Sequence, residues 1–422
     1  MKTSASARNQ SATAATLRKG CGRLALCNSR NLGIEDVPFY EMRKALALLG
    51  LCTLAVACFS AVDNLYFTQF LGRDLVFLGV MVSVFNVTVS LAELPFSVLF
   101  DRYSQRAVLL AGIVVRIVAF AAFFWAVNDG VLLTGQFLAG IASAAMSGTL
   151  EALVMNQVDT STAEKSSKTL TVMQFVRSGT SLAGGLAGVA VYAIWPPAIW
   201  LLGIAALIGA AMVSWTVPDS QEAAEYTWRE LGANLKTAVW SHQALALILV
   251  NSAALGPFML WQIKFGQASL CLVAAGYAAM CLGGLGAATL QEKLNIPSRW
   301  AWAVAVANIL AAALFALAQQ QFFVWITFAL HVAMQTILII QVSGRYHTRI
   351  SDSVRASALS VISLADSIVT ALFAPAVAAI GLACGLDKAI MLSAAVYALI
   401  AVLLFFTRNA GTASETATPT AA

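Results

Sequence analysis

The sequence predicts an all-α membrane protein with twelve transmembrane helices in two pseudo-symmetric six-helix bundles. The chain of 422 residues is 60% hydrophobic and only 11% charged, whereas about a quarter of the residues in a soluble domain are charged. Its apolar runs last for about 20 residues, the length of a helix that crosses a bilayer, and do not alternate as β-barrel strands do. The longest internal hydrophilic stretch, residues 218–243, separates two groups of six runs. This pattern excludes a water-soluble globular enzyme.

The first group of spans follows a polar N-terminal stretch. The third span is interrupted only by Arg116, and the fifth carries Gly179, Gly184, Gly185 and Gly188, small residues that permit close helix contact. We expect the six spans at 45–70, 75–100, 107–127, 131–154, 169–194 and 198–217.

The second group repeats features of the first. The first span ends in Tyr66-Phe67-Thr68-Gln69 and the seventh in Trp261-Gln262, and a glycine follows each. Two related halves are typical of transporters whose binding site lies between them. We expect these six spans at 244–264, 269–290, 300–318, 322–342, 356–381 and 389–407.

The distribution of basic residues predicts the orientation. Short cytoplasmic loops carry an excess of Lys and Arg, and placing the N-terminus inside puts 20 of the 25 basic residues on the cytoplasmic side. We therefore expect both termini to be cytoplasmic. The predicted parts are a disordered tail at 1–42, a six-helix bundle at 43–217, a cytoplasmic linker at 218–243, a second bundle at 244–407 and a tail at 408–422.

Several kinds of chemistry have no pattern in this chain. The basic residues form no cluster for nucleic acid, and the seven cysteines lack the spacing of a zinc site. There is no P-loop, no HExxH and no GxSxG. We expect no enzymatic activity, no metal and no cofactor.

The turn after the second span carries a recognisable motif. Residues 93–106 read ELPFSVLFDRYSQR, which resembles the Gly-x-x-x-Asp-Arg-x-Gly-Arg-Arg signature of the major facilitator superfamily, preceded by the Glu-x-Pro of one of its branches. Residues 147–153 (SGTLEAL) and 355–360 (RASALS) are similar to stretches of the same branch. The resemblance implies the major facilitator fold and alternating access between two halves.

The resemblance also implies roles at the cytoplasmic side. In that family the loop cluster latches the two halves when the cytoplasmic side closes, and Glu-x-Pro lies beside it. A charged loop that only sets topology is the alternative. The residues implied in gating or the latch are Glu93, Asp101, Arg102, Arg106 and Glu151.

Polar residues inside spans are the candidates for coupling and substrate binding, because such residues normally face a cavity or a partner. Asp63 lies on the first span, which lines the central cavity in the resembling family; the alternative places it at the outer interface. His331 is a proton carrier or a packing residue, and Arg177 and Asp366 form a cross-half pair or stay apart. Arg116 is expected to pair within the first half; the alternative is contact with the substrate. The candidates are Asp63, Asn86, Arg177, Gln262, His331 and Asp366.

The function that follows is secondary active transport. We expect proton-coupled export of a small amphipathic drug or metabolite, since the resemblance is to branches that export such molecules. We expect the protein to work as a monomer in the plasma (inner) membrane. One alternative is an importer or facilitator of a small organic solute. The other is a membrane receptor or scaffold that does not transport.

Overall fold

A computed structural model describes the protein at residues 39–102, 104–126, 128–155, 163–218, 241–294, 296–347 and 352–407. The predicted tails, apart from residues 39–42, which belong to the first helix, and nearly all of the predicted linker lie outside these ranges. So do the side chains of Asp101, Arg102 and Glu151. The domain boundaries therefore stay predictions.

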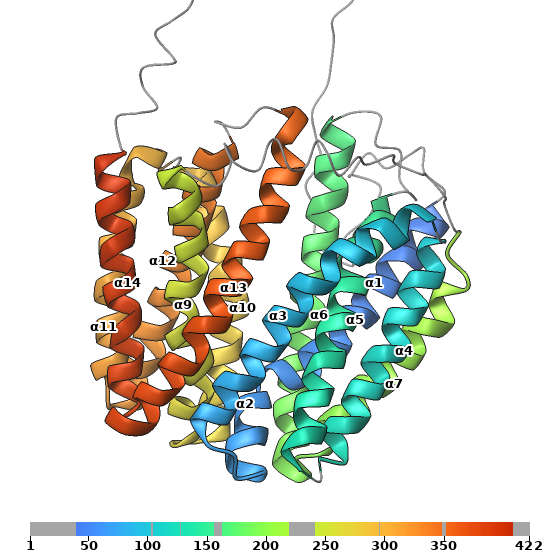
Figure 1. The fold of residues 1–422 in the computed structure, drawn as a ribbon, viewed down its shortest axis with the longest axis horizontal. Helices are drawn as coiled ribbons and strands as arrows, with labels where there is room; N and C mark the ends of the chain where they lie inside the picture. Colours follow the sequence, from blue (N-terminus) through green and yellow to red (C-terminus); the bar gives the residue numbers. More distant parts are fainter. Residues whose placement is uncertain are drawn as a thin grey trace, which may run out of the picture.

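The first half of the chain is helical (Figure 1). Ser104 caps one of its helices, because its side chain accepts a hydrogen bond from the Ala107 amide at 3.2 Å. The elements are α1 (Phe39–Ser60), α2 (Asp63–Leu65), the π-helix η2 (Tyr66–Phe70), α3 (Leu75–Arg102), α4 (Gln105–Phe124), α5 (Asp129–Met155), α6 (Ala163–Ile194) and α7 (Ala198–Ser214).

The second half repeats this organisation. Ser241 caps its first helix by accepting a hydrogen bond from the Ala244 amide at 3.0 Å. The elements are α9 (His242–Gly266), α10 (Leu270–Leu294), the 3₁₀-helix η3 (Ser298–Trp300), α11 (Ala301–Leu317), α12 (Gln321–His347), α13 (Asp352–Cys384) and α14 (Leu386–Phe406).

The all-helical membrane fold is confirmed. Each predicted span overlaps a described helix, and ten described helices are long and apolar enough to cross a membrane, with α7 a shorter apolar helix. The prediction of one continuous first span is wrong, because α1 ends at Ser60 and a new helix begins at Asp63. Val62 leaves the helical region there, with φ −141°.

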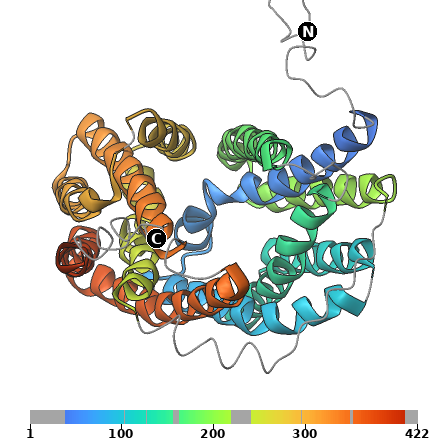
Figure 2. The ribbon, with the colours of Figure 1, turned by 90° about the horizontal axis from the view of Figure 1, so that it is seen from above.

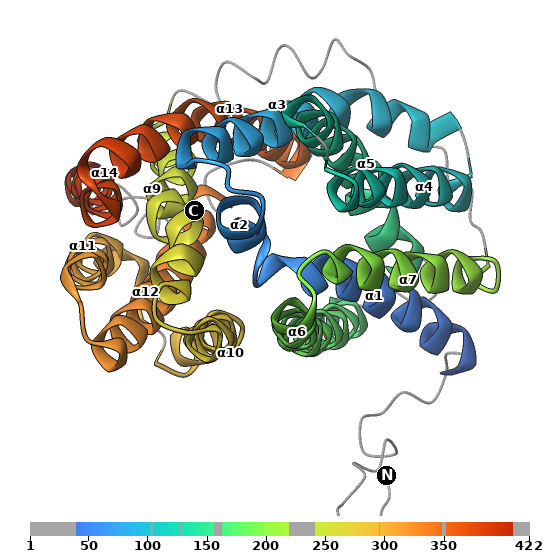
Figure 3. The ribbon, with the colours of Figure 1, turned by 90° about the horizontal axis from the view of Figure 1, so that it is seen from below.

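The two halves pack through equivalent helices. The second helix of each half contacts the fifth helix of the other, as α3 on α13 and α6 on α10, and α2 packs on α9. Seen from above and from below, the halves lie side by side with α3 along α13 (Figures 2 and 3). This arrangement agrees with the predicted pseudo-symmetry.

One end of the molecule, which we call the α2 end, holds the halves together. The opposite end, where α1 begins and α14 finishes, we call the terminal end. The halves converge toward the α2 end in Figure 1. There Gly79 of α3 lies so close to α13 that an added Cβ would be 2.9 Å from the Ala374 carbonyl oxygen and from Pro375 Cα. Only glycine allows this approach without a shift of backbone.

We predict that Gly79→Ala destabilises this packing by about 1–3 kcal/mol, the usual effect of overfilling a packed interface. The midpoint of thermal unfolding of the purified protein should fall. The matched control is Gly286→Ala, where an added Cβ meets nothing within 4 Å, so its midpoint should hold or rise. Equal midpoints for the two variants would refute the tight α3–α13 contact.

Candidate functional site

Five residues form a hydrogen-bonded contact between the halves at the α2 end, which we call the interlock: Ser60, Asp63, Asn64, Met259 and Gln262. The Gln262 amide donates from Nε2 to Asp63 Oδ1 at 2.7 Å and to the Ser60 carbonyl at 2.9 Å. Its Oε1 accepts from the Asn64 backbone amide at 2.9 Å, and Asn64 Nδ2 donates to the Met259 carbonyl at 2.8 Å. Gln262 is 2% exposed, so one buried side chain joins α9 to the break after α1.

The break in the first span creates this geometry. Because the helix stops at Ser60, the Ser60 carbonyl is available to accept from Gln262. The new helix starts with Asp63, whose carboxylate also accepts from the Asn64 amide at 3.0 Å. Asp63 Oδ1 thus accepts two hydrogen bonds, one from each half of the chain.

Aromatic clusters hold the two sides of the interlock in place. In the first half, the ring centroid of buried Trp200 lies 4.7 Å from that of Phe123 and 5.4 Å from that of Tyr66, and the Tyr66 hydroxyl donates to the Phe123 carbonyl at 2.9 Å. In the second half, Trp261 stacks on Phe328 at 5.5 Å. The residues next to Asp63 and Gln262 are therefore fixed by packing.

Two further hydrogen bonds link the halves near the interlock. The Ser60 and Tyr277 hydroxyls lie 3.2 Å apart, joining α1 to α10, and the Ser83 hydroxyl donates to the Ala371 carbonyl at 2.5 Å, joining α3 to α13. Together with the interlock, these are the hydrogen bonds between the halves that connect described residues. They lie on helix segments nearest the α2 end, so that end is closed.

A cavity of about 350 Å³ lies within the first half, between α1, α4, α5 and α6. Arg116 and Arg177 line it together with Thr53, Ser143 and Ser147. The expected partner for Arg116 within its own half is not found among the described residues, and its buried Nε has no hydrogen-bond partner there. The structure instead brings Arg116 to the same cavity as Arg177.

Arg177 and Asp366 are not brought together. Asp366 Oδ2 accepts from Asn251 Nδ2 at 3.0 Å, a contact between α13 and α9. Within the described part of the chain, no ion pair joins Asp366 to Arg177. Of the two alternatives, the arrangement that the structure shows is the one in which these two residues stay apart.

His331 lies fully buried inside the second half. Its Nδ1 is 2.8 Å from Asn308 Oδ1, and Gln335 Oε1 accepts from Asn308 at 3.3 Å and from the Tyr397 hydroxyl at 2.7 Å. Gln335 also donates to the Val250 carbonyl at 3.0 Å. This network joins α9, α11, α12 and α14, while the buried His331 Nε2 has no hydrogen-bond partner among the described residues.

The remaining candidates lie on the first half. Asn86 donates to the Val82 carbonyl of its own helix at 2.8 Å, and Glu93 is half-buried on α3. Arg106 donates to the carbonyl of Val217, beyond the end of α7. The contacts of the other latch residues, Asp101, Arg102 and Glu151, fall outside the described side chains.

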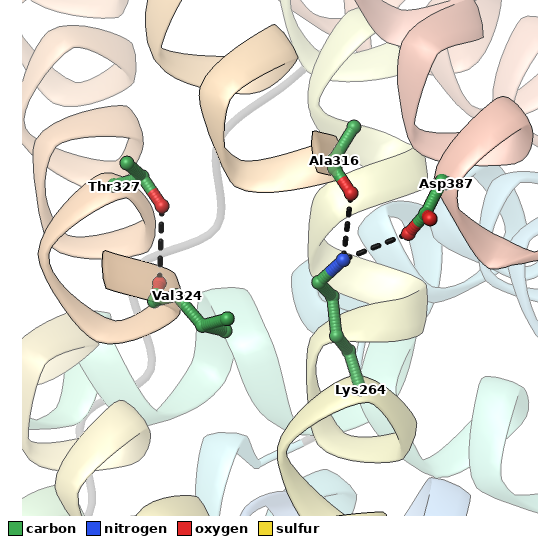
Figure 4. A network of polar contacts seen from close by, with 5 residues as sticks. All are labelled: Lys264, Ala316, Val324, Thr327 and Asp387. Atoms are coloured by element: carbon green, nitrogen blue, oxygen red, sulfur yellow. Dashed lines mark hydrogen bonds and ion pairs between the residues drawn. The ribbon is translucent and has the colours of Figure 1, made fainter. Parts of the chain in front are cut away.

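Sequence reasoning missed a polar cluster at the α2 end of the second half (Figure 4). Lys264 of α9 lies 2.8 Å from the carboxylate of Asp387 on α14 and donates to the Ala316 carbonyl on α11 at 2.7 Å. The Lys264 side chain is only 10% exposed, and a pocket of about 310 Å³ lies beside it. A lysine near the end of an apolar span was the available signal.

Comparisons with known proteins agree with this architecture. The family model for the Major Facilitator Superfamily matches residues 45–349. The structure is similar to the nucleoside transporter NupG, with a TM-score of 0.71, 12% identity and coverage of 87% of this chain and 98% of that one. It is also similar to a bacterial homologue of the human lysosomal transporter Spinster, in an inward-facing and unoccupied conformation. The TM-score is 0.71, the identity is 12%, and the match covers 89% of this chain and 98% of that one.

A third similar structure is the POT family transporter PepTSo, with a TM-score of 0.65, 11% identity and coverage of 88% of this chain and 98% of that one. No curated protein matches the sequence. The family match extends over most of the chain and includes both the motif after the second span and the interlock. The chain belongs to the Major Facilitator Superfamily and is an integral, multi-pass membrane transporter rather than an enzyme.

Proposed function

We propose that this transporter exports a small amphipathic molecule in exchange for protons, and that Asp63 is the group that carries the proton. The interlock is the observation that supports this most strongly. It places a carboxylate at a contact between the halves that must open during alternating access. When the contact opens, the carboxylate exchanges Gln262 for water, so its protonation state is coupled to the conformation.

The amphipathic character of the cargo is supported by the cavity in the first half. Its wall combines arginine and hydroxyl groups with the apolar side chains of Leu49, Val56, Met146 and Leu150. A volume of about 350 Å³ suits a small organic molecule. The family assignment favours transport over the non-transporting receptor or scaffold.

Flux in membrane vesicles of known orientation tests the coupling and the direction. In inside-out vesicles that are acidic inside, an exporter driven by proton exchange accumulates substrate, and collapsing the pH gradient stops the accumulation. Accumulation only in right-side-out vesicles would instead support the alternative, an importer or facilitator. Nucleosides and peptides belong in the substrate panel, because similar structures are a nucleoside transporter and a POT family transporter bound to a conjugated peptide.

We also propose an orientation of the protein in the membrane. The excess of Lys and Arg supports a cytoplasmic location for both termini, in the plasma (inner) membrane, and the α2 end then faces outward. Residues Asp101, Arg102, Arg106 and Glu151 would then form the cytoplasmic latch of a protein that works as a monomer. A single cysteine at Ala223, in a background without native cysteines, should resist impermeant maleimide in intact cells; labelling from outside would reverse the topology.

A further inference from the structure

We propose that the cavity lined by Arg116 and Arg177 binds the anionic group, a carboxylate or similar oxyanion, of the transported molecule. This inference rests on the proposed transport function and names the class of its substrate. The binding site for the charged end of the molecule would be the cavity in the first half, whose lining residues come from α1, α4, α5 and α6.

The first argument is charge. Two arginines line one small cavity, and none of the described lining residues is Asp or Glu. An anion in the cavity is attracted by the positive charges of both arginines. The ion pairs among described residues, Arg73–Asp129 and Lys264–Asp387, do not include Arg116.

The second argument is the burial of Arg116. It is 6% exposed, and its buried Nε finds no acceptor among the described residues. A buried guanidinium is strongly destabilising unless an acceptor compensates it. Because Arg116 lines the cavity, an oxyanion there can accept hydrogen bonds from its guanidinium in the bidentate geometry that arginine favours.

The third argument is the placement of hydroxyl groups. Ser143 and Ser147 are one helical turn apart and thus share a face of α5, and both line the cavity with Thr53 of α1. The Thr53 hydroxyl already donates to the Leu49 carbonyl at 2.8 Å. The two serine hydroxyls are additional donors to an oxyanion, while Met146 on the same helix contacts its apolar part.

The test is site-specific protection from labelling. Ser147→Cys places a thiol at an exposed lining position, in a background without native cysteines, and the rate of maleimide labelling is measured on purified protein. The probes are benzoate and hexanoate, with benzamide and hexanamide as neutral counterparts of the same shape. We expect the carboxylates to slow labelling and the amides to have little effect.

Arg116 variants identify the group responsible. Arg116→Gln should weaken the apparent benzoate affinity about 10- to 100-fold, the usual effect of losing a charge-assisted hydrogen bond, and Arg116→Lys should restore part of it. Ser363→Cys, exposed on α13 of the other half, should label at the same rate with and without benzoate.

Three results would overturn the proposal: no protection by either carboxylate, equal protection by the amides, or unchanged protection in Arg116→Gln. The comparison of acids with amides needs no change at Arg116, so it remains decisive if that variant fails to fold. Binding is measured without a membrane gradient. A failure of proton coupling in the flux assay therefore leaves this test intact, and the reverse also holds.

Discussion

Asp63→Asn should abolish accumulation driven by a pH gradient, down to the level of vesicles without the protein, while exchange that needs no gradient continues. The physical reason is that asparagine cannot take up or release a proton. It keeps the shape of the side chain and an oxygen that can accept hydrogen bonds from Gln262 and from the Asn64 amide, as Asp63 Oδ1 does. The variant therefore removes the chemistry of the interlock and keeps its hydrogen bonds.

The measurement is substrate uptake into oriented vesicles, with and without an imposed pH gradient, compared with Asp74→Asn. Asp74 is exposed at the same end of the molecule and caps the start of α3 through the Phe77 amide, a role that asparagine can fill. That control should transport normally, and His331→Gln should retain most of its proton dependence. Full gradient-driven transport by Asp63→Asn would exclude Asp63 and direct attention to Glu93 or Asp366.

Gln262→Leu should have the second large effect, a shift of the conformational equilibrium away from the closed α2 end. Leucine has a similar volume but makes none of the three hydrogen bonds that Gln262 makes to Ser60, Asp63 and Asn64. Leaving a buried polar group without its partner costs about 1–3 kcal/mol, and 1.4 kcal/mol changes an equilibrium about tenfold. We expect turnover to fall at least tenfold, because the α2 end no longer closes efficiently.

The matched control is Gln267→Leu, an exposed glutamine at the end of the same helix. Turnover in that variant should stay near the unmodified rate. If both variants transport equally well, the interlock is a packing contact with no part in the cycle.

The sequence predicted the architecture well because the bilayer imposes a strong constraint. Apolar runs of fixed length must become helices, and the even division of runs and the motif at 93–106 indicated the family. Gln262 was identified as a candidate from its place after Trp261. Its partners were not, because a hydrogen bond between positions about 200 residues apart depends on how two helices are rotated against each other.

Other features left no local signal. Ala61 and Val62 are apolar, so hydropathy predicts an uninterrupted span across the break after α1. Only the contact with α9 shows what the break contributes. Arg116 was expected to pair within its own half, but pairing depends on which direction the guanidinium takes from α4. The structure places Arg116 in the lining of a cavity that it shares with Arg177.

The most direct test of the central claim, that the interlock opens and closes the α2 end, is a distance measurement between spin labels on the two halves at that end. Ile194→Cys at the end of α6 and Gln320→Cys before α12 are exposed positions for the labels. The unmodified interlock should give a main short distance with a minor longer one, and Gln262→Leu should make the longer distance dominant. An identical distance distribution in the two proteins would contradict the account.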